Sequence, residues 1–411
     1  MNLQLTAPDK AVATIELPTS KSVSNRALLI SALCGDAAHV SRLALCDDTM
    51  VMMEALKHHS GEINVGGAGT AMRFLTAYFA TLDGSVTILD GVERMRQRPI
   101  GPLVDALRSL GARIDYLDRE GYPPLRVSGT KLSGGEVVLP GGVSSQFTSA
   151  LMMILPVVGG GRIRLTGDVV SASYLNMTVE VMRRFGATVD ISDYGIIVGD
   201  GYTGGELIVE GDWSAAVPWY AIAALLQQSS ITLQGLIQDS IQGDARLVEL
   251  GSKLGIVSRF DSSGVTLDTS QVINCCCSTF ADMSATPDLA MSWAVLMCLL
   301  ERSFRMTGLR TLHLKESDRL EALRQGLLQL GYVLKVESED AISWYGERVA
   351  LARATPWIES LGDHRVAMAF APAAVRFPGL VIGDAEVVSK SYPAFWRHLE
   401  KSGFTVRELA Q

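Results

Sequence analysis

Residues 17–26 set two cations and several hydroxyls close together at the predicted start of a helix. Ser22 and Arg26 are four positions apart and so share one helix face, while Lys21 lies in the first turn. The unpaired backbone N–H groups of a helix start would complete an anion-binding site. The alternative is an ordinary solvated helix start. No Gly-rich run precedes Lys21, so a Walker-type nucleotide loop is excluded.

The helix that must position these groups is marked at both ends. Pro18 ends the preceding strand, Thr19 or Ser20 can cap the helix, and good helix formers continue through residues 27–33. Gly35 then stops it. The sequence therefore predicts a helix that begins next to Lys21.

Two further segments carry glycine or arginine in patterns that suit an anionic ligand. The Gly-rich stretch 66–70, which includes Gly69, precedes a helical run and permits close backbone approach to a ligand. Three arginines crowd residues 93–99, and Pro99 keeps Arg98 extended. The alternatives are a plain chain turn for the first segment and a solvated charged face for the second.

A loop at residues 141–147 enters a predicted helix with two hydroxyls and an amide. Ser144, Ser145 and Gln146 together suit a sugar-like polyol or a phosphate. The alternative is an ordinary capping sequence, because serine is a favoured N-cap residue.

Two acids stand where proton transfer is chemically reasonable. On a predicted helix start, Lys315 and Arg319 share a face with Glu316 beside them, which gives two cations and an acid that can move a proton. Asp288 opens the apolar run 289–300, so we expect it at a helix N-terminus, either as a cap or as a catalytic carboxylate. Surface ion pairing is the alternative for the first group.

Loops near the end of the chain add two more cations, Arg365 and Lys390. His364 alone makes no metal site, and such a residue is more often satisfied by hydrogen bonds. Converging cations would bind ligands with several negative charges, as two phosphorylated carboxylates would supply. The cations selected in this way are Lys21, Arg26, Arg98, Lys315, Arg319, Arg365 and Lys390.

The composition limits the class of protein. A chain of 411 residues is long enough for two domains, and 48% hydrophobic with 19% charged residues indicates a well-buried globular fold. A formal net charge of -8 argues against nucleic acid or an anionic membrane as partner. The cysteines, including Cys275–Cys277, fit neither zinc nor disulfide spacing, so we expect a reduced, cytoplasmic protein without a leader or membrane span.

A repeat organises the chain. An amphipathic helix that ends in a Gly-containing turn and runs into strands recurs five times, with spacings of 75, 69, 76 and 72 residues between Gly111, Gly186, Gly255, Gly331 and Gly403. A shorter copy near His59 would make six. The sequence therefore predicts α/β units in two lobes, divided near residues 209–212. A Rossmann sheet is the alternative, because residues 67–72 weakly resemble its glycine-rich dinucleotide-binding fingerprint.

At this point the motifs resemble those of the EPSP synthases, the 3-phosphoshikimate 1-carboxyvinyltransferases of the shikimate pathway. The matching segments occur in the family's order and spacing and span nearly the whole chain: residues 17–26, 69–73, 98–100, 144–146, 315–320 and 363–365. The resemblance implies a two-lobe inverse α/β barrel with three βαβαββ units in each lobe. Residues 1–19 and 212–411 would form the C-terminal lobe and residues 20–211 the N-terminal lobe, with the active site in the cleft between them.

The resemblance also implies a reaction. The enolpyruvyl group of phosphoenolpyruvate would pass to the 5-hydroxyl of shikimate 3-phosphate, with release of phosphate, by addition and elimination through a tetrahedral intermediate. Aromatic amino acids and chorismate depend on this step. No metal or organic cofactor is expected, and the family's habit is a cytoplasmic monomer whose partners are its two small substrates.

The resemblance also implies a role for each residue that matches a site position of the family. Asp288 would take the proton from the 5-hydroxyl, Glu316 would relay the proton on the methylene carbon, and Lys21 would meet both substrates. Shikimate 3-phosphate would contact Lys21, Ser22, Arg26, Ser144, Ser145, Gln146, Ser171, Tyr174, Asp288, Thr311 and Lys315. Phosphoenolpyruvate would contact Lys21, Gly69, Arg98, Gln146, Arg319, Arg365 and Lys390.

Three positions depart from the family pattern. Gly67 and Thr311 each stand where asparagine is usual, and the segment 171–174 lacks the common Lys-Pro between its serine and tyrosine. These departures bear on affinity rather than on the reaction. Two alternatives stay open. The first is a UDP-N-acetylglucosamine enolpyruvyl transferase, although such enzymes typically carry Lys-Asn in place of Lys21-Ser22 and a reactive cysteine in a mobile loop. The second is a non-catalytic homologue that binds anions.

Overall fold

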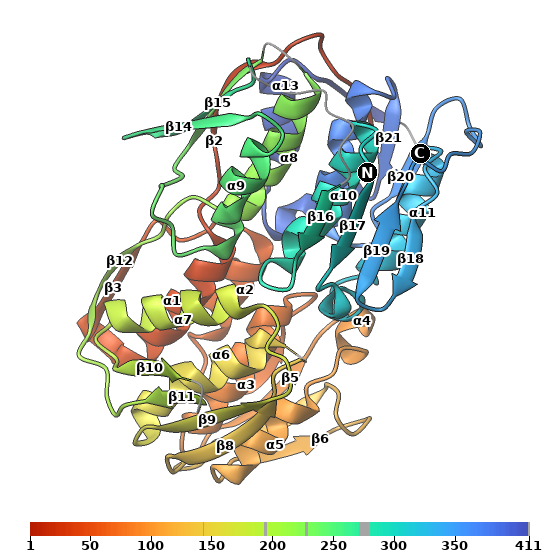
Figure 1. The fold of residues 1–411 in the computed structure, drawn as a ribbon. Helices are drawn as coiled ribbons and strands as arrows, with labels where there is room; N and C mark the ends of the chain where they lie inside the picture. The colour runs from red at the N-terminus through yellow and green to blue at the C-terminus, as the bar shows by residue number, and fades with distance from the viewer. Residues whose placement is uncertain (143, 193–194, 227–228, 271–278, 410–411) are drawn as a thin grey trace. The chain divides into compact units, whose positions relative to one another are not determined.

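The chain folds into two compact units, which we describe separately (Figure 1). The structure is a computed structural model that describes residues 1–142, 144–192, 195–226, 229–270 and 279–409. The N-terminal unit is Thr19–Val209, and the C-terminal unit joins Met1–Pro18 to Glu210–Gln411. The chain therefore begins in one unit, builds the other and then returns.

The N-terminal unit alternates strands and helices. Its helices are α1 (Lys21–Cys34), α2 (Asp47–Ala55), α3 (Gly69–Thr81), α4 (Glu93–Arg96), α5 (Gly101–Ser109), α6 (Ser145–Ile154) and α7 (Ala172–Arg184). Its strands are β3 (Ala38–Ser41), β4 (Gly61–Asn64), β5 (Val86–Asp90), β6 (Arg113–Tyr116), β7 (Leu125–Ser128), β8 (Gly135–Pro140), β9 (Gly161–Thr166), β10 (Val189–Ser192), β11 (Gly195–Val198) and β12 (Gly205–Ile208).

The C-terminal unit repeats this alternation. Its α-helices are α8 (Trp213–Leu225), α9 (Leu247–Ser252), α10 (Ala290–Leu299), α11 (Arg319–Gln329), α12 (His364–Phe370) and α13 (Phe395–Lys401). Its strands are β1 (Asn2–Thr6), β2 (Val12–Glu16), β13 (Ser230–Gln234), β14 (Val257–Asp261), β15 (Gly264–Asp268), β16 (Thr279–Asp282), β17 (Phe304–Thr307), β18 (Lys335–Ser338), β19 (Ala341–Trp344), β20 (Trp357–Glu359), β21 (Leu380–Gly383) and β22 (Thr405–Leu409).

One βαβαββ pattern generates the sheets. In the order β4, α3, β5, α5, β6, β7, for example, the first two strands pair in parallel and the last two form an antiparallel hairpin beside them. The described residues contain five such four-stranded sheets. The first strand of the chain completes one of them, because β1 pairs antiparallel with β21 and β22. The Rossmann alternative is wrong, since no sheet of the described residues exceeds four strands.

The sixth copy is truncated, as the sequence predicts. Its sheet has two strands only, β3 and β12, which pair in parallel within the described chain. Between the end of α2 at Ala55 and the start of β4 at Gly61 there are too few residues for the hairpin that the other copies carry. The short segment around His59 therefore replaces two strands.

The repeated glycines end five helices in the same way. All five have positive φ, between +80° and +101°. After α5, Gly111 N donates to Arg108 O and Ala112 N donates to Leu107 O, which is the hydrogen-bond pair of a Schellman motif. The same pair closes α7, α9, α11 and α13. Glycine recurs because an L side chain is disfavoured at this φ.

The helices that lie between the sheets are apolar on all sides. In the C-terminal unit, every residue of α8 except Ser214 and every residue of α10 except Ser292 is buried. A helix that is hydrophobic all round must be enclosed. Each contacts its neighbours: α10 packs against α8 and α12. The sheets therefore form the outer layer and the helices the core of this unit (Figure 1).

Several absences can be stated for the described residues. Cys34, Cys46 and Cys298 are free thiols. The triple Cys275–Cys277 lies outside the described residues. No described helix combines the length and hydropathy needed to cross a bilayer.

Replacing Gly186 or Gly111 with alanine tests the repeat. Both glycines have positive φ, so each substitution strains the backbone by about 1–2 kcal/mol. At Gly186 the new Cβ would also overlap the side chain of Thr203, whereas nothing lies within 4 Å at Gly111. We expect urea unfolding, followed by circular dichroism, to show a lower midpoint for both and a larger drop for Gly186→Ala. Equal midpoints for the two variants would contradict the packing argument.

Candidate functional site

In the N-terminal unit, the start of α1 is built as predicted. Ser20 is the N-cap, and its Oγ accepts from Val23 N at 3.4 Å. Lys21 Nζ donates to Asp48 Oδ2 at 2.9 Å, and Asp48 is buried at the start of α2. Asp48 was not among the predicted site residues, although the consecutive carboxylates Asp47 and Asp48 at a helix start were a visible signal. Lys21 is thus held in place by a carboxylate of the neighbouring helix.

Arg26 connects three helices of this unit. Its Nε donates to Thr178 Oγ1 at 2.7 Å on α7, and its Nη2 to Ser149 Oγ at 3.3 Å on α6. Nη1 donates to the Ser22 carbonyl at 2.9 Å within α1, and Nη2 also reaches the Tyr174 carbonyl at 3.4 Å. Burial lowers the pKa of Arg26 to about 10, so the guanidinium stays charged at neutral pH. Arg26 therefore fixes the helices on which the predicted ligand residues stand.

Two helix starts present the predicted hydroxyl groups. Ser144 caps α6, where its Oγ accepts from Gln146 N at 3.3 Å. Gln146 Nε2 in turn donates to Thr70 Oγ1 at 3.2 Å, which joins α6 to α3. Ser171 precedes α7 and is buried with φ +57°, a backbone conformation that is strained for serine. Both serines therefore stand at helix starts, where backbone N–H groups favour an anion.

Gly69 and Arg98 meet in the same unit. A Cβ placed on Gly69 would lie 2.5 Å from Arg98 Nη1, so a side chain at this position would displace the guanidinium of Arg98. Arg73 Nη1 donates to the Gly69 carbonyl at 3.2 Å and its Nη2 to the Pro99 carbonyl at 3.0 Å. The glycine-rich segment and the arginine segment are thus brought together by Arg73, which was not among the predicted site residues.

In the C-terminal unit, Arg319 is the centre of a buried acidic cluster. Its guanidinium is 2% exposed and donates to Asp363 Oδ2 at 2.8 Å, Asp288 Oδ1 at 2.8 Å and Glu316 Oε2 at 2.9 Å. Burial by itself would lower the pKa of Arg319. The three carboxylates outweigh burial and raise the pKa of Arg319 above its ordinary value.

Asp363 is the innermost of these acids and is fully buried. Its Oδ1 accepts from Arg365 N at 2.9 Å, which caps α12, and its Oδ2 accepts from Ser317 Oγ at 3.1 Å. Burial opposes ionisation, yet the adjacent guanidinium of Arg319 prevails, and the pKa of Asp363 is lowered. Asp363 belongs to a recognised motif, but sequence reasoning gave it no role.

Asp288 receives cations from three directions. Besides Arg319, Lys315 Nζ lies 3.3 Å from its Oδ1 and Arg365 Nη2 lies 3.3 Å from its Oδ2. Asp288 belongs to a short 3₁₀ turn, Pro287–Leu289, that precedes α10, so it does not cap that helix. Three of the predicted residues of the C-terminal unit, Lys315, Arg319 and Arg365, therefore converge on this carboxylate.

The local prediction for Lys315 and Arg319 is wrong in one respect. Helix α11 begins at Arg319 and is capped by Asp318, whose Oδ1 accepts from Glu321 N at 3.2 Å. Lys315 and Glu316 lie in the preceding loop, so Lys315 and Arg319 share no helix face. They are brought together instead by Asp288, which approaches from a distant part of the sequence.

Arg365 leads to a second buried acid. Its Nη2 also donates to Ser214 Oγ at 3.2 Å, and the Ser214 hydroxyl donates to Asp244 Oδ2. Burial raises the pKa of Asp244 to about 6, although the nearby Arg365 opposes this shift. Neither Ser214 nor Asp244 stands in a motif of the kind used above, so the sequence gave no signal for them.

Two predicted residues lie nearby in the same unit. Lys390 Nζ donates to the Gly362 carbonyl at 3.0 Å, in the loop that precedes α12. Thr311 is buried in the 3₁₀ turn Arg310–Leu314, and its Oγ1 has no hydrogen-bond partner among the described residues. Within the described part of the chain, no group of three or more histidines, cysteines and acids is arranged to hold a metal ion.

Comparison with known proteins identifies relatives of this chain. The sequence matches the family model of EPSP synthase (3-phosphoshikimate 1-carboxyvinyltransferase) over residues 5–64 and 59–399. A 3-phosphoshikimate 1-carboxyvinyltransferase from Bacteroides fragilis is 47% identical over 410 residues, which cover 99% of both chains. Another of this name from Photobacterium profundum is 34% identical over 426 residues, covering 94% of this chain and 95% of the relative.

A solved structure supports the fold independently. EPSP synthase from Acinetobacter baumannii aligns with a TM-score of 0.74 at 20% identity, covering 99% of this chain and 100% of the other. At that identity the likeness concerns the fold, and the predicted two-lobe inverse α/β class is confirmed. Together with the family model and the relatives, it leads to one conclusion: this chain belongs to the EPSP synthase family.

Proposed function

We propose that this chain transfers the enolpyruvyl group of phosphoenolpyruvate to the 5-hydroxyl of shikimate 3-phosphate and releases phosphate. One observation carries the proposal: Asp288, a buried carboxylate at the predicted base position, is contacted by Lys315, Arg319 and Arg365. The named activity of the full-length relatives supports it. The residues of both units would serve one pair of substrates.

The acid–base chemistry falls to the two predicted acids of the C-terminal unit. Asp288 takes the proton from the 5-hydroxyl, which then attacks C2 of phosphoenolpyruvate. Glu316 delivers a proton to the methylene carbon, and the tetrahedral intermediate forms. In the elimination step Glu316 takes back a proton from the resulting methyl group, the C2–O bond to the phosphate breaks, and the leaving phosphate takes the proton that Asp288 had accepted. Arg319 supports these roles because it holds both carboxylates at hydrogen-bond distance.

The cations stabilise charge that is present throughout the reaction. Arg319, Arg365 and Lys390 of the C-terminal unit, with Lys21 and Arg98 of the other, bind the carboxylate and phosphate of phosphoenolpyruvate. Preorganised cations of this kind also help the phosphate to leave, since they need no rearrangement when charge develops. Asp288 and Asp363 already hold the guanidinium of Arg319 in place.

Shikimate 3-phosphate is bound mainly by the N-terminal unit. Its phosphate meets the starts of α6 and α7 through Ser144, Ser145 and Ser171, where hydroxyls and helix N–H groups gather. Gln146 and Tyr174 stand in the first turns of the same two helices. Ser22 and Arg26 complete the set from α1, and Lys315 with Thr311 orients the ring from the other unit.

The proposal also covers the compartment and the oligomeric state of the enzyme. The enzyme acts as a cytoplasmic monomer on small molecules alone. The free thiols at Cys34, Cys46 and Cys298 support a reducing compartment.

The acceptor is tested by phosphate release from phosphoenolpyruvate in two parallel assays, one with shikimate 3-phosphate and one with UDP-N-acetylglucosamine. We expect release with shikimate 3-phosphate only, because Lys21 is followed by Ser22 rather than asparagine. Release with the nucleotide sugar alone would transfer the assignment to the related transferase. No phosphate release in either assay would favour the non-catalytic homologue that binds anions.

Asp288→Asn tests the base. The amide keeps the size of the side chain but cannot accept the hydroxyl proton, so we expect kcat to fall by at least about 100-fold while substrate binding persists. Steady-state kinetics together with calorimetric titration of shikimate 3-phosphate separates the two effects. Asp261→Asn is the matched control, because Asp261 is an exposed acid of the same unit. Full activity in Asp288→Asn would remove Asp288 from the mechanism.

Thr311→Val tests a substrate contact. Because Thr311 Oγ1 has no partner among the described residues, removing it should leave the free energy of unfolding unchanged or slightly raised. If the hydroxyl bonds to shikimate 3-phosphate, KM for that substrate should rise by about 5- to 10-fold with little change in kcat. An unchanged KM would show that Thr311 makes no such contact.

A further inference from the structure

Asp244 is a buried acid of the C-terminal unit to which the proposed reaction gives no role. It belongs to the 3₁₀ turn Gly243–Arg246, which packs against α8, and it is 5% exposed. Its Oδ2 accepts from the hydroxyl of Ser214, in the first turn of α8. Burial of a carboxylate is unfavourable unless polar or charged groups face it. Ser214 connects Asp244 to such a group, because Ser214 also contacts Arg365.

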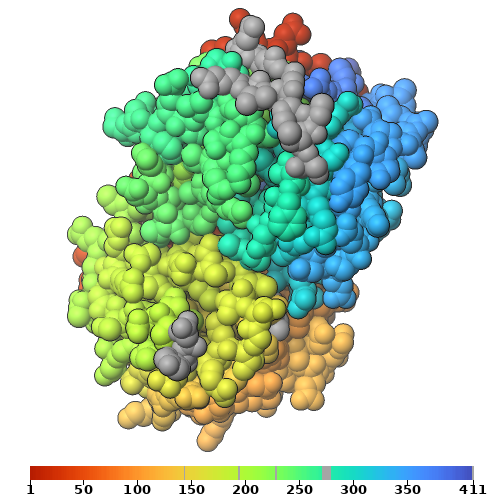
Figure 2. All heavy atoms as spheres, viewed as in Figure 1, coloured from red at the N-terminus to blue at the C-terminus, as the bar shows by residue number. Residues whose placement is uncertain are grey.

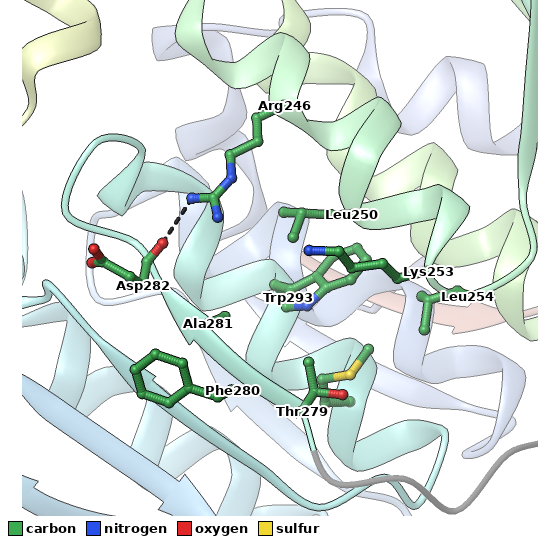
Figure 3. A pocket seen from close by; sticks show the side chains of 10 residues that line it. Arg246, Leu250, Lys253, Leu254, Thr279, Phe280, Ala281, Asp282 and Trp293 are labelled. Atoms are coloured by element: carbon green, nitrogen blue, oxygen red, sulfur yellow. Dashed lines mark hydrogen bonds between the residues drawn. The ribbon is translucent and has the colours of Figure 1, made fainter.

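The turn that carries Asp244 is held on two sides. Arg246, its last residue, donates from Nη1 to the carbonyl of Asp282 in β16 at 2.7 Å (Figure 3). Helix α9 follows the turn directly, and the space-filling view shows the α9 and β16 segments next to each other at the surface (Figure 2). Arg246 thus fastens the turn to β16, while the buried Asp244 fastens it to α8. The position of the Asp244 carboxylate is therefore fixed.

Asp244 sets the direction of the Ser214 hydroxyl. A serine hydroxyl has one hydrogen to donate, whereas an ionised carboxylate can only accept. Burial raises the pKa of Asp244 to about 6, so the carboxylate is ionised at neutral pH and receives the Ser214 hydrogen. Ser214 Oγ is then left as an acceptor, and it accepts from Arg365 Nη2 at 3.2 Å.

Arg365 lies between two acids. On one side its Nη2 is 3.3 Å from Asp288 Oδ2 and its Nη1 is 3.4 Å from the Asp288 carbonyl. Both distances exceed the roughly 2.7–2.9 Å of a close charge-assisted hydrogen bond. On the other side are Ser214 and the charge of Asp244, which attracts the guanidinium, since the nearby Arg365 lowers the pKa of Asp244. Without that second attraction, Arg365 would form a closer pair with Asp288.

We propose that Asp244 is a positioning residue, which acts through Ser214 to keep Arg365 apart from Asp288 and in place for an anionic group of phosphoenolpyruvate. The inference rests on the proposed function, in which Arg365 contacts phosphoenolpyruvate and Asp288 is the base. Asp244 itself touches no substrate. Its effect is on the affinity for phosphoenolpyruvate, because Arg365 is the only residue through which it acts.

Asp244→Asn removes the charge and keeps the size of the side chain. The amide offers both a donor and an acceptor to Ser214, so the hydroxyl is no longer held in one direction. We expect KM for phosphoenolpyruvate to rise by about tenfold, as for the loss of one hydrogen bond to a charged group. The value of kcat and the KM for shikimate 3-phosphate should change little. Initial rates of phosphate release, with each substrate varied in turn, separate these constants. An unchanged KM for phosphoenolpyruvate, or an equal rise for both substrates, would overturn the proposal.

Ser214→Ala shows whether Asp244 acts through the hydroxyl. This variant should raise KM for phosphoenolpyruvate as Asp244→Asn does. The double variant should be no worse than the more affected single variant, because both changes remove the same connection to Arg365. Effects on KM that multiply in the double variant would show separate actions and would contradict the proposal.

Ser258→Ala is the matched control. Its hydroxyl is hydrogen-bonded to the hydroxyl of Tyr220, also in α8, at 2.7 Å. Loss of this hydrogen bond should lower the urea midpoint without a change in KM. A rise of KM for phosphoenolpyruvate in Ser258→Ala as large as in Asp244→Asn would reduce the role of Asp244 to general stability.

A binding measurement without turnover separates this inference from the proposed reaction. Phosphoenolpyruvate alone is titrated by calorimetry into the wild type, Asp244→Asn and Ser258→Ala. We expect Kd to be about tenfold higher in Asp244→Asn only. A wild type that binds phosphoenolpyruvate but releases no phosphate would refute the reaction, while the change in Kd still decides the role of Asp244. A wild type that does not bind phosphoenolpyruvate would overturn both.

Discussion

The buried guanidinium of Arg319 is the interaction on which the C-terminal unit depends. Three carboxylates from separate segments end on this one group: Asp288 before α10, Glu316 in the loop before α11, and Asp363 at the start of α12. A buried charge is tolerated only when it is paired and hydrogen-bonded, and breaking such a pair costs about 3–5 kcal/mol. The segments that carry both predicted proton-transfer residues are thus held together by one cation, which we also propose as a phosphoenolpyruvate contact.

A second buried arginine organises the N-terminal unit by different means. Arg26 bonds to hydroxyls and carbonyls of α1, α6 and α7, where Arg319 bonds to carboxylates. Desolvation therefore dominates, and the pKa of Arg26 is lowered to about 10, whereas the pKa of Arg319 is raised. Both remain cations at neutral pH. The guanidinium of Arg319 fixes the acids that we propose for proton transfer, and that of Arg26 fixes the helices that we propose for binding the anion.

Helix starts, helix ends and the truncated repeat could be predicted from the sequence, because each depends on a few adjacent residues or on the length of one segment. Glycines such as Gly111 mark helix ends because positive φ and a Schellman motif are properties of a few adjacent residues. The cap at Ser20 and the helix stop at Gly35 follow from the same short-range rules. The truncated repeat near His59 was visible for a related reason, since a missing hairpin is missing chain length.

Partners that come from distant parts of the chain were beyond such rules. Lys315 and Arg319 were expected to meet on a helix, yet they meet through Asp288, which is 27 residues before Lys315. Asp244 has no motif of its own and gains its place only because Ser214 and Arg365 fold against it. The resemblance to a known family implied roles for single residues, but it did not indicate these contacts between distant residues.

The truncated repeat shows which part of the βαβαββ pattern the site requires. This copy contributes α1 and α2, and so Lys21, Arg26 and Asp48, although its sheet has only the strands β3 and β12 among the described residues. Its helices contact α3, α6 and α7 of complete copies. The ion pair of Lys21 with Asp48 and the four hydrogen bonds of Arg26 are made entirely among helices. The hairpin belongs to the outer layer, so it can be lost while the inner face keeps its geometry.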